Sequence, residues 1–382
     1  MPPSTSTASF VLTAVPLFIF MAELAQRTRI MDLAFRSIAP WAALIPGRLL
    51  HSNVIGSALF AAVSGSSAAT CATVTTLTLP ELKRRGYPMR LVLGSLAGPS
   101  TLGILIPPSI ILIVYGALVM ESIRLLFIAG IIPGLMLAFM FSTYLAVASF
   151  FLPAPSVEAR AYSWQERWRN LPGLLPVLLL MVGILGGIYL GWVTPTEAAA
   201  SGILGVVLIG LALRTLSVKA VWESLLPSVQ TTSMVLLIYV GAAMLSTALA
   251  YLGAARFLVE WVSSLVVSRY IILMGLYAIY LVLGMFFEGF AILVMTTPLV
   301  HPVIVKLGFD GVWFGIILTI PIETALITPP VGFNLFIVQG VWGEPLRDVI
   351  VSTFPMVLVL LVGLSVLTVW PEVALWLPNM AH

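Results

Sequence analysis

Oxygen-bearing side chains gather where a long apolar stretch of this 382-residue sequence is interrupted. The interruption reads Ser64-Gly65-Ser66-Ser67, with Thr70 one helical turn further along, and Ser100-Thr101 follows between Gly98 and Gly103. Hydroxyl oxygens and exposed backbone carbonyls coordinate bare cations such as Na⁺, whereas the N–H groups at a helix N-terminus favour anions. These residue types beside glycines therefore indicate a site for an ion.

Two carboxylates lie inside apolar runs in the second half of the chain. Glu288 precedes Gly289, and Glu323 is followed by Thr324 and then by Thr328. An ionisable side chain at membrane depth is costly and by default a functional candidate. For each carboxylate the alternative is a hydrogen-bonded structural role.

The motifs of several other chemistries are missing from the sequence. It contains no GxxxxGK[ST] for an ATP-driven motor, no GxSxG or HExxH for a hydrolase, and no TVGYG for a potassium filter. Its one cysteine, Cys71, excludes a disulfide within the chain. We therefore expect no enzyme activity, no cofactor besides a coupling ion, and no nucleic-acid partner.

The composition identifies the solvent around these residues as lipid. Apolar residues make up 60% of the chain and charged residues 9%, whereas roughly a quarter of an ordinary globular chain is charged. Several stretches reach the roughly 20 apolar residues that a spanning helix needs. Because these runs are continuous rather than alternating, we expect an all-α polytopic membrane protein and not a barrel.

The hydropathy pattern divides the chain into two similar parts joined by a linker. The expected first part, 9–151, holds a helix at 9–25, an amphipathic arm, a hairpin at 49–80, a broken helix at 91–116 and a helix at 123–151. Residues 152–228 hold a linker, with an interfacial helix at 153–172, and connecting transmembrane helices. The second part, 229–378, repeats this order with a helix, an arm, a hairpin at 270–303, a broken helix at 311–340 and a final helix at about 351–377.

An internal repeat at an offset of 222 residues supports this division. Residues that set backbone geometry recur in one register, namely Pro80 with Pro302, Gly86 with Gly308, Pro99 with Pro321, and Pro107-Pro108 with Pro329-Pro330. Proline and glycine constrain backbone bends, so shared positions imply shared bends. The two parts therefore should have the same fold.

The segment 49–80 is too long for one comfortable span and has a polar centre. We interpret it as a re-entrant hairpin with its tip at 64–67, because polar backbone at membrane depth usually lines a cavity. The alternative is one tilted helix with a small-residue packing face. The second hairpin should have its tip at Glu288-Gly289.

The positions of the basic residues indicate how the repeats are oriented. If both hairpins return to the side they entered from, all Lys and Arg residues fall on one side except Arg124, Arg256, Arg269 and Lys306. The basic side should be cytoplasmic, which makes the repeats inverted. Inverted repeats with broken helices and a midplane site are typical of secondary transporters.

Six sequence motifs carry a family resemblance that runs from about residue 9 to the C-terminus. They are PLFIFMAEL, ALFAAVSGSSAAT, LPELKRRGYP, STLGILIPPSIILIVYG, GWVTPTEAAA and LITPPVGFNLFIV. Together they resemble the large membrane (permease) subunit of TRAP (tripartite ATP-independent periplasmic) transporters. The resemblance implies an elevator-type, ion-transporter-like fold in a bacterial or archaeal cytoplasmic membrane.

The resemblance also implies a function and partners. It implies sodium-coupled import of an organic acid such as a dicarboxylate, with a small membrane subunit and a periplasmic binding protein that delivers the substrate. The substrate-binding residues that it implies are Ser66, Ser67, Thr70, Glu288 and Thr328. The sodium-binding residues that it implies are Ser64, Gly65, Ser66, Gly98, Thr101, Gly103, Glu288, Gly289, Glu323 and Thr324.

The chain departs from the family pattern in two places. Members of the family usually begin with further residues that include another spanning helix, so we expect an N-terminally shortened member. Pro99-Ser100 replaces a pair of small residues before the first break. Two alternatives remain open, a proton-coupled anion carrier using Glu288 and Glu323, and an inactive or truncated membrane scaffold subunit.

Overall fold

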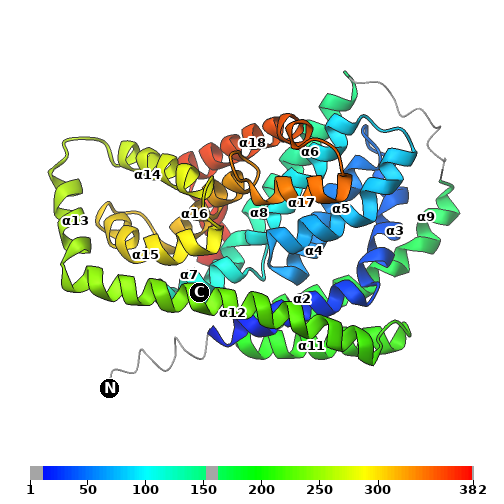
Figure 1. The fold of residues 1–382 in the computed structure, drawn as a ribbon, viewed down its shortest axis with the longest axis horizontal. Coiled ribbons are helices and arrows are strands. Elements are labelled where there is room, and N and C mark those ends of the chain that lie inside the picture. The colour runs from blue at the N-terminus through cyan, green and yellow to red at the C-terminus, as the bar shows by residue number, and fades with distance from the viewer. Residues whose placement is uncertain (1–11, 152–161, 381–382) are drawn as a thin grey trace.

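All regular secondary structure in residues 12–151 and 162–380, which the computed structural model describes, is helical (Figure 1). The start of the expected span at 9–25 and the first part of the expected interfacial segment at 153–172 lie outside these residues. The helical fold confirms the expected all-α class.

The helices of the first repeat and of the connecting segment are α2 (Ala14–Arg27), α3 (Ile30–Ala42), α4 (Leu50–Ser64), α5 (Ser67–Arg84), α6 (Met89–Ser100), η1 (Thr101–Ile104), α7 (Ile110–Val119), α8 (Ile123–Ser149), α9 (Trp164–Asn170), η2 (Leu171–Leu174), α10 (Leu175–Tyr189) and α11 (Pro195–Ala212). Those of the second repeat are α12 (Val218–Tyr251), α13 (Ala254–Ser264), α14 (Arg269–Gly284), α15 (Gly289–Lys306), α16 (Gly311–Leu326), α17 (Phe333–Trp342), α18 (Leu346–Val369) and α19 (Glu372–Met380).

The offset of 222 residues relates the helices of the two halves. It carries α5 onto α15 from the first residue to the last, and α7 onto α17 with a shift of one residue. It also pairs the amphipathic arm α3 with α13 and the helix α8 with α18. The repeat seen in the proline pattern therefore extends to whole elements.

The first hairpin turns at residues 65 and 66. Gly65 has a left-handed φ of 61°, which ends α4, and the Ser66 hydroxyl accepts a hydrogen bond from Ala69 N at 3.4 Å, which caps α5. With 15 residues, α4 is about 22 Å long, short of the roughly 30 Å of the hydrocarbon core. A re-entrant hairpin is confirmed, and the single tilted helix is wrong.

The second hairpin has the same plan at its tip. Between α14 and α15, the Glu288 carboxylate accepts hydrogen bonds from Phe290 N at 2.8 Å and Ala291 N at 3.3 Å. Glu288 caps α15 at the position that Ser66 occupies before α5, one repeat earlier. A carboxylate and a hydroxyl thus have the same capping role in the two tips.

Both helices that were expected to be broken, at 91–116 and 311–340, are interrupted in the structure. The first interruption begins only after Ser100. The helix α6 continues through Gly98 and Pro99 to Ser100, and the irregular segment runs from Thr101 to Ser109. Pro99 has no N–H to donate to the Ser95 carbonyl, which weakens α6 just before it ends. In the second repeat, residues 327–332 separate α16 from α17.

Two expected helix limits differ from the structure. The helix α12 begins at Val218 rather than at 229, so it crosses the boundary expected at 228. The expected final helix at 351–377 is two helices, α18 and α19, with Trp370 and Pro371 between them. Proline has no N–H to continue the helical ladder. The division into two repeats and a linker at the stated boundaries stays a prediction.

An outer layer of long helices lies beside the hairpins (Figure 1). In this layer α2 packs against α11 and α12, and α10 packs against α11. Among the described residues, the six helical segments long and apolar enough to cross a membrane are α8, residues 164–189, α11, α12, α15 and α18. Length and composition alone select these six, and one of them, α15, is an arm of the second hairpin. The chain is thus a polytopic bundle in which hairpins and broken helices lie among longer apolar helices.

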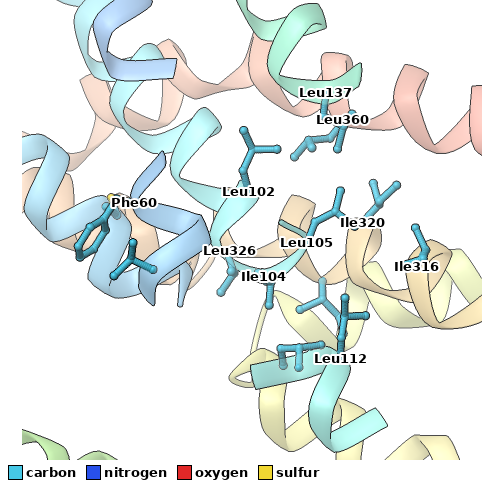
Figure 2. Packing of buried hydrophobic residues seen from close by; sticks show 14 of the residues in the cluster. Phe60, Leu102, Ile104, Leu105, Leu112, Leu137, Ile316, Ile320, Leu326 and Leu360 are labelled. Carbon is cyan, nitrogen blue, oxygen red and sulfur yellow. The ribbon is translucent and has the colours of Figure 1, made fainter. Parts of the chain in front are cut away.

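The first break lies against α16 in the hydrophobic core. Figure 2 shows Ile104 of η1 beside Leu326 of α16, with Leu105 close to Ile320 of α16. All four side chains are buried. The core therefore holds the first interruption against the helix that ends where the second interruption begins.

Candidate functional site

The first hairpin tip lies against the first break through backbone contacts. A Cβ atom on Gly103 would lie 2.5 Å from the Ser66 carbonyl oxygen, and one on Gly65 would lie 2.6 Å from the Pro108 carbonyl oxygen. Ile110 N also donates to the Gly65 carbonyl at 3.5 Å. Glycine is required at both positions, because any side chain would separate the tip from the break.

Hydroxyl and carbonyl oxygens form a compact group at this tip. The Thr70 hydroxyl donates to the Ser66 carbonyl at 2.7 Å, and the Ser64 and Thr70 hydroxyl oxygens lie 3.0 Å apart. Both side chains are buried. Because a hydroxyl that donates one hydrogen bond keeps its lone pairs, these oxygens are suited to a small cation.

The second tip meets the second break in a corresponding way. Val331 N donates to the Met285 carbonyl at 3.1 Å, and Gly289 lies directly against the Ile322 side chain. Glu288 is exposed at this tip, where it caps α15. Each hairpin tip is therefore held by the break of its own repeat.

Glu323 is the least satisfied polar group near the breaks. Its side chain is fully buried in α16, and neither carboxylate oxygen has a hydrogen-bond partner in the described part of the chain. Its counterpart one repeat earlier is Thr101, whose buried hydroxyl donates to the Gly98 carbonyl at 2.7 Å. A buried charge without a partner is costly, so this carboxylate fits a cation as its missing partner.

Two threonines follow Glu323 on the same segment. The Thr324 hydroxyl donates to the Ile320 carbonyl at 2.7 Å, and the Thr328 hydroxyl donates to the Thr324 carbonyl at 2.6 Å. Thr324 is buried, whereas Thr328 is partly exposed at the start of the break. Both hydroxyls keep lone pairs that a cation or a hydrogen-bond donor could use.

A hydrogen bond between the repeats involves a residue that the sequence reasoning missed. Asn334 of α17 is fully buried and donates from Nδ2 to the Ser67 hydroxyl at 2.8 Å. Its Oδ1 atom has no partner within the described residues, and its carbonyl accepts from the Cys71 thiol at 3.7 Å. The sequence did contain a signal for Asn334, because an amide side chain is unusual inside the apolar run that follows Pro329-Pro330.

The contacts between the repeats are reciprocal. The second arm of each hairpin packs against the second half of the other repeat's broken helix, α5 against α17 and α15 against α7. Tyr115 of α7 adds a hydrogen bond to the Gly311 carbonyl of α16 at 2.7 Å. Such an exchange is what a two-fold relation between inverted repeats produces, and it surrounds the breaks with both hairpins.

Gly98 is placed differently from the other candidates. A Cβ atom there would lie 2.6 Å from Cβ and Cγ of Met356, so Gly98 allows α18 to approach α6. Its carbonyl already accepts the Thr101 hydroxyl. The ligand roles of all these residues, Gly98 included, stay predictions, and Gly98 also has a packing role.

We expect Asn334→Ala to weaken both stability and ion binding. Losing the bond to Ser67 should lower the free energy of unfolding by about 1–3 kcal/mol, because a buried hydroxyl loses its donor. Sodium-dependent thermal stabilisation should fall as well, since the bond joins the first tip to the second break. The measurement is thermal unfolding in detergent, in sodium and in choline salts.

The matched control for this substitution is Asn53→Ala. Asn53 is also buried and donates from Nδ2 to a serine hydroxyl, Ser95, at 2.8 Å, but the bond stays within the first repeat. It should cost similar stability and leave the sodium effect intact. An equal sodium response in both variants would exclude a role for Asn334 in the site.

Known proteins resemble this chain over nearly its whole length. Residues 4–373 match the family described as the tripartite ATP-independent periplasmic transporter, DctM component. The C4-dicarboxylate TRAP transporter large permease protein DctM of Pseudomonas aeruginosa is 37% identical, with 97% of this chain and 86% of that protein covered. The ectoine/5-hydroxyectoine TRAP transporter large permease protein UehC of Ruegeria pomeroyi is 32% identical, with 97% and 86% covered.

A solved structure shares the fold. The Alcanivorax borkumensis YdaH transporter superposes with a TM-score of 0.68 at 13% identity, covering 96% of this chain and 85% of that one. On the family match and these relatives, the chain belongs to the DctM family, the large permease components of tripartite ATP-independent periplasmic transporters.

Proposed function

We propose that the chain imports an organic acid by coupling its movement to sodium. The observation that carries this proposal is the buried Glu323 carboxylate, without a partner among the described residues and one repeat away from Thr101. The family is one of transporter permeases rather than enzymes, and its members are multi-pass proteins of the inner membrane. Transport follows from the family, and the coupling ion and the substrate are the proposed part.

In the proposed mechanism the chain's own groups hold the ion and the solute in neighbouring places. Oxygens of Ser64, Ser66 and Thr70 at the first tip, and the carboxylate of Glu323, are the proposed cation ligands. A bound cation would neutralise Glu323 and make the region less repulsive to an anionic solute. Coupling then follows, because each charge lowers the cost of placing the other at low dielectric.

The solute's carboxylate is proposed to bind at the hairpin tips. The N-terminus of α5 at Ser66-Ser67 and the N-terminus of α15 at Gly289 carry the positive ends of helix dipoles. At α15 the solute's carboxylate would share this end with Glu288, which already accepts from Phe290 N and Ala291 N. The name of the Pseudomonas aeruginosa relative makes a C4-dicarboxylate the first candidate. The name of the Ruegeria pomeroyi relative shows that ectoine is carried by another member, so the candidate has to be tested.

We propose that transport requires two partners. These are the small membrane subunit and the periplasmic substrate-binding protein of a TRAP system, as the resemblance of the chain to a large permease subunit implies. The test therefore uses proteoliposomes that hold the chain with its small subunit, supplied with the binding protein. A subunit that acts only as a scaffold would show no uptake in this complete system.

The uptake experiment compares Ser66→Ala and Glu288→Gln with the unmodified chain. Both should lower sodium-driven uptake of a labelled C4-dicarboxylate by about tenfold or more, because a hydrogen bond to a charged group contributes about 1.5–3 kcal/mol. Glutamine keeps an oxygen that caps α15, so the Glu288 variant should still fold.

Ser365→Ala on the exposed face of α18 is the matched control and should transport normally. Normal uptake in both tip variants would mean that the hairpin tips do not bind the ion or the solute. Uptake that follows a pH gradient and ignores sodium would favour the proton-coupled carrier.

A further inference from the structure

Two cavities occupy the same place in the two repeats, between an arm helix and its hairpin. The first, of about 520 Å³, lies between α3 and the α4–α5 hairpin, and the second, of about 460 Å³, lies between α13 and the α14–α15 hairpin. Lining positions coincide at the repeat offset, as for Leu49 with Ile271 and Leu77 with Leu299. Figure 1 shows that α13 follows α12 at one end of the molecule and lies next to the α14–α15 hairpin.

The chemistry of the two cavities is opposite. The first is lined by Arg36 and Glu81 among other charged side chains, whereas the residues at the same positions of the second are Leu258 and Val303. Trp261, also in the second cavity, replaces Ala39 of the first. The second cavity therefore has no charged side chain that could hold water or a polar solute.

The two hydroxyl groups of the second cavity are already paired. The Tyr280 hydroxyl lies 2.6 Å from the Thr296 hydroxyl, which donates to the Ile292 carbonyl at 2.7 Å. An apolar cavity without free hydrogen-bonding groups does not retain water. A volume of this size is within the range of small-ligand sites, about 300–1,000 Å³, so its occupant should be a hydrocarbon.

A cation lies close in the chain to two of the lining residues. Arg269 lies two residues from both Val267 and Ile271, which line the cavity, and its side chain is exposed. Its guanidinium lies over the rings of Tyr270 and Phe309, at 5.2 and 4.9 Å, and has no carboxylate partner within the described ranges. A phosphate is the group that arginine at a membrane interface commonly binds.

We propose that the second cavity binds a phospholipid, with an acyl chain between α13 and the hairpin and the phosphate at Arg269. The bilayer supplies this molecule directly, because α13 and the loop after it expose Phe257 and Val266. The charge of Arg269 and the dry lining together select a phospholipid over a polar solute. The lipid would separate the arm from the hairpin by hydrocarbon, so that the two can shift without breaking hydrogen bonds.

Gly275→Leu is the variant that tests the proposal. Gly275 lines the cavity, and a Cβ atom there meets nothing within 4 Å, so the backbone position accepts a side chain, and leucine should reduce the volume open to an acyl chain. Leucine also favours the helix over glycine, so α14 should still form. Gly183→Leu on α10 is the matched control, because its Cβ also meets nothing within 4 Å and it is not a lining residue.

The probe is a phosphatidylglycerol that carries a diazirine on one acyl chain, in vesicles that hold the purified chain. After illumination, mass spectrometry maps the labelled residues. We expect label on Tyr280 and Val303, which are buried behind the hairpin surface. This label should be lost in Gly275→Leu and kept in Gly183→Leu, and Arg269→Gln should reduce it.

Three results would overturn the proposal. Label confined to exposed residues such as Phe257 would mean that only surrounding lipid is near. Unchanged label on Tyr280 and Val303 in Gly275→Leu would place the chain elsewhere. Equal labelling by a diazirine fatty alcohol, with no effect of Arg269→Gln, would mean that any hydrocarbon enters and that no phospholipid is selected.

Discussion

We expect sodium to stabilise the purified chain against heat, and we expect replacement of Glu323 by glutamine to abolish that stabilisation. A ligand that binds only the folded state stabilises it by mass action, by about 2.7 kcal/mol at a concentration one hundred times its dissociation constant. This free energy corresponds to several degrees in the melting temperature of a chain of a few hundred residues. In the glutamine variant the buried anion that would bind the cation is gone.

Without sodium, the same substitution should leave the stability of the folded chain unchanged or raise it. Glu323 is fully buried and both of its oxygens lack partners in the described structure. Removing a buried, unpaired charge by an amide of the same shape relieves its desolvation cost. In choline chloride the variant should therefore be at least as stable as the unmodified chain, a sign that a structural carboxyl would not produce.

The measurement is thermal unfolding in detergent, in sodium chloride and in choline chloride at equal ionic strength. Glu372→Gln, an exposed carboxylate in the first turn of α19, is the matched control and should keep the sodium effect. Equal destabilisation of the Glu323 variant in both salts would mean a structural carboxyl. Absence of any sodium effect in the well-folded unmodified chain would exclude sodium as the stabilising cation.

The second large loss of stability and sodium binding is expected from Gly103→Ala, which adds a single methyl group. In Gly103→Ala the new Cβ would lie 2.5 Å from the Ser66 carbonyl oxygen and 2.8 Å from Ser67 N. Both are backbone atoms, so the hairpin tip itself has to move. We expect a loss of about 1–3 kcal/mol in the free energy of unfolding, as for overpacked cores, together with loss of most of the sodium stabilisation and uptake.

The control for this variant is Gly186→Ala on α10. The nearest atom to a Cβ there is 4.0 Å away, so alanine fits and should leave both stability in choline and the sodium effect unchanged. A Gly103→Ala chain with normal sodium stabilisation would mean that contact between the tip and the break is not needed for the ion site. The two predictions thus test the charge and the geometry of one site separately.

Much of the fold is predictable from local signals. Glycine and proline act on their own backbone, so the shared pattern at an offset of 222 residues anticipated two hairpins and two broken helices, which the structure confirms. The tip at Gly65 was predictable for the same reason, since a left-handed glycine ends a helix wherever the chain folds. The second tip was indicated by Glu288, which caps α15. Lipid as the surrounding solvent followed from composition alone.

Local signals were insufficient where distant segments decide the outcome. Gly98 has the same residue type as Gly103, yet one packs against Met356 of α18 and the other against the hairpin tip. Asn334 reaches Ser67 from the other repeat, and no spacing within either segment indicates that bond. The start of α12 at Val218 was missed because its first turns carry charged residues, and the expected limit was set by where the apolar run begins.

The sequence by itself determined the membrane environment, the repeat and the residue types available at the tips, because these depend on composition and on the backbone limits of single residues. Only the tertiary structure decided that the Ser64 and Thr70 hydroxyls meet, that Glu323 is left without a partner among the described residues, and that equivalent cavities in the two repeats have opposite chemistry. The physical reason is that burial and pairing are properties of contacts between segments far apart in the chain, and a near two-fold arrangement brings those segments together.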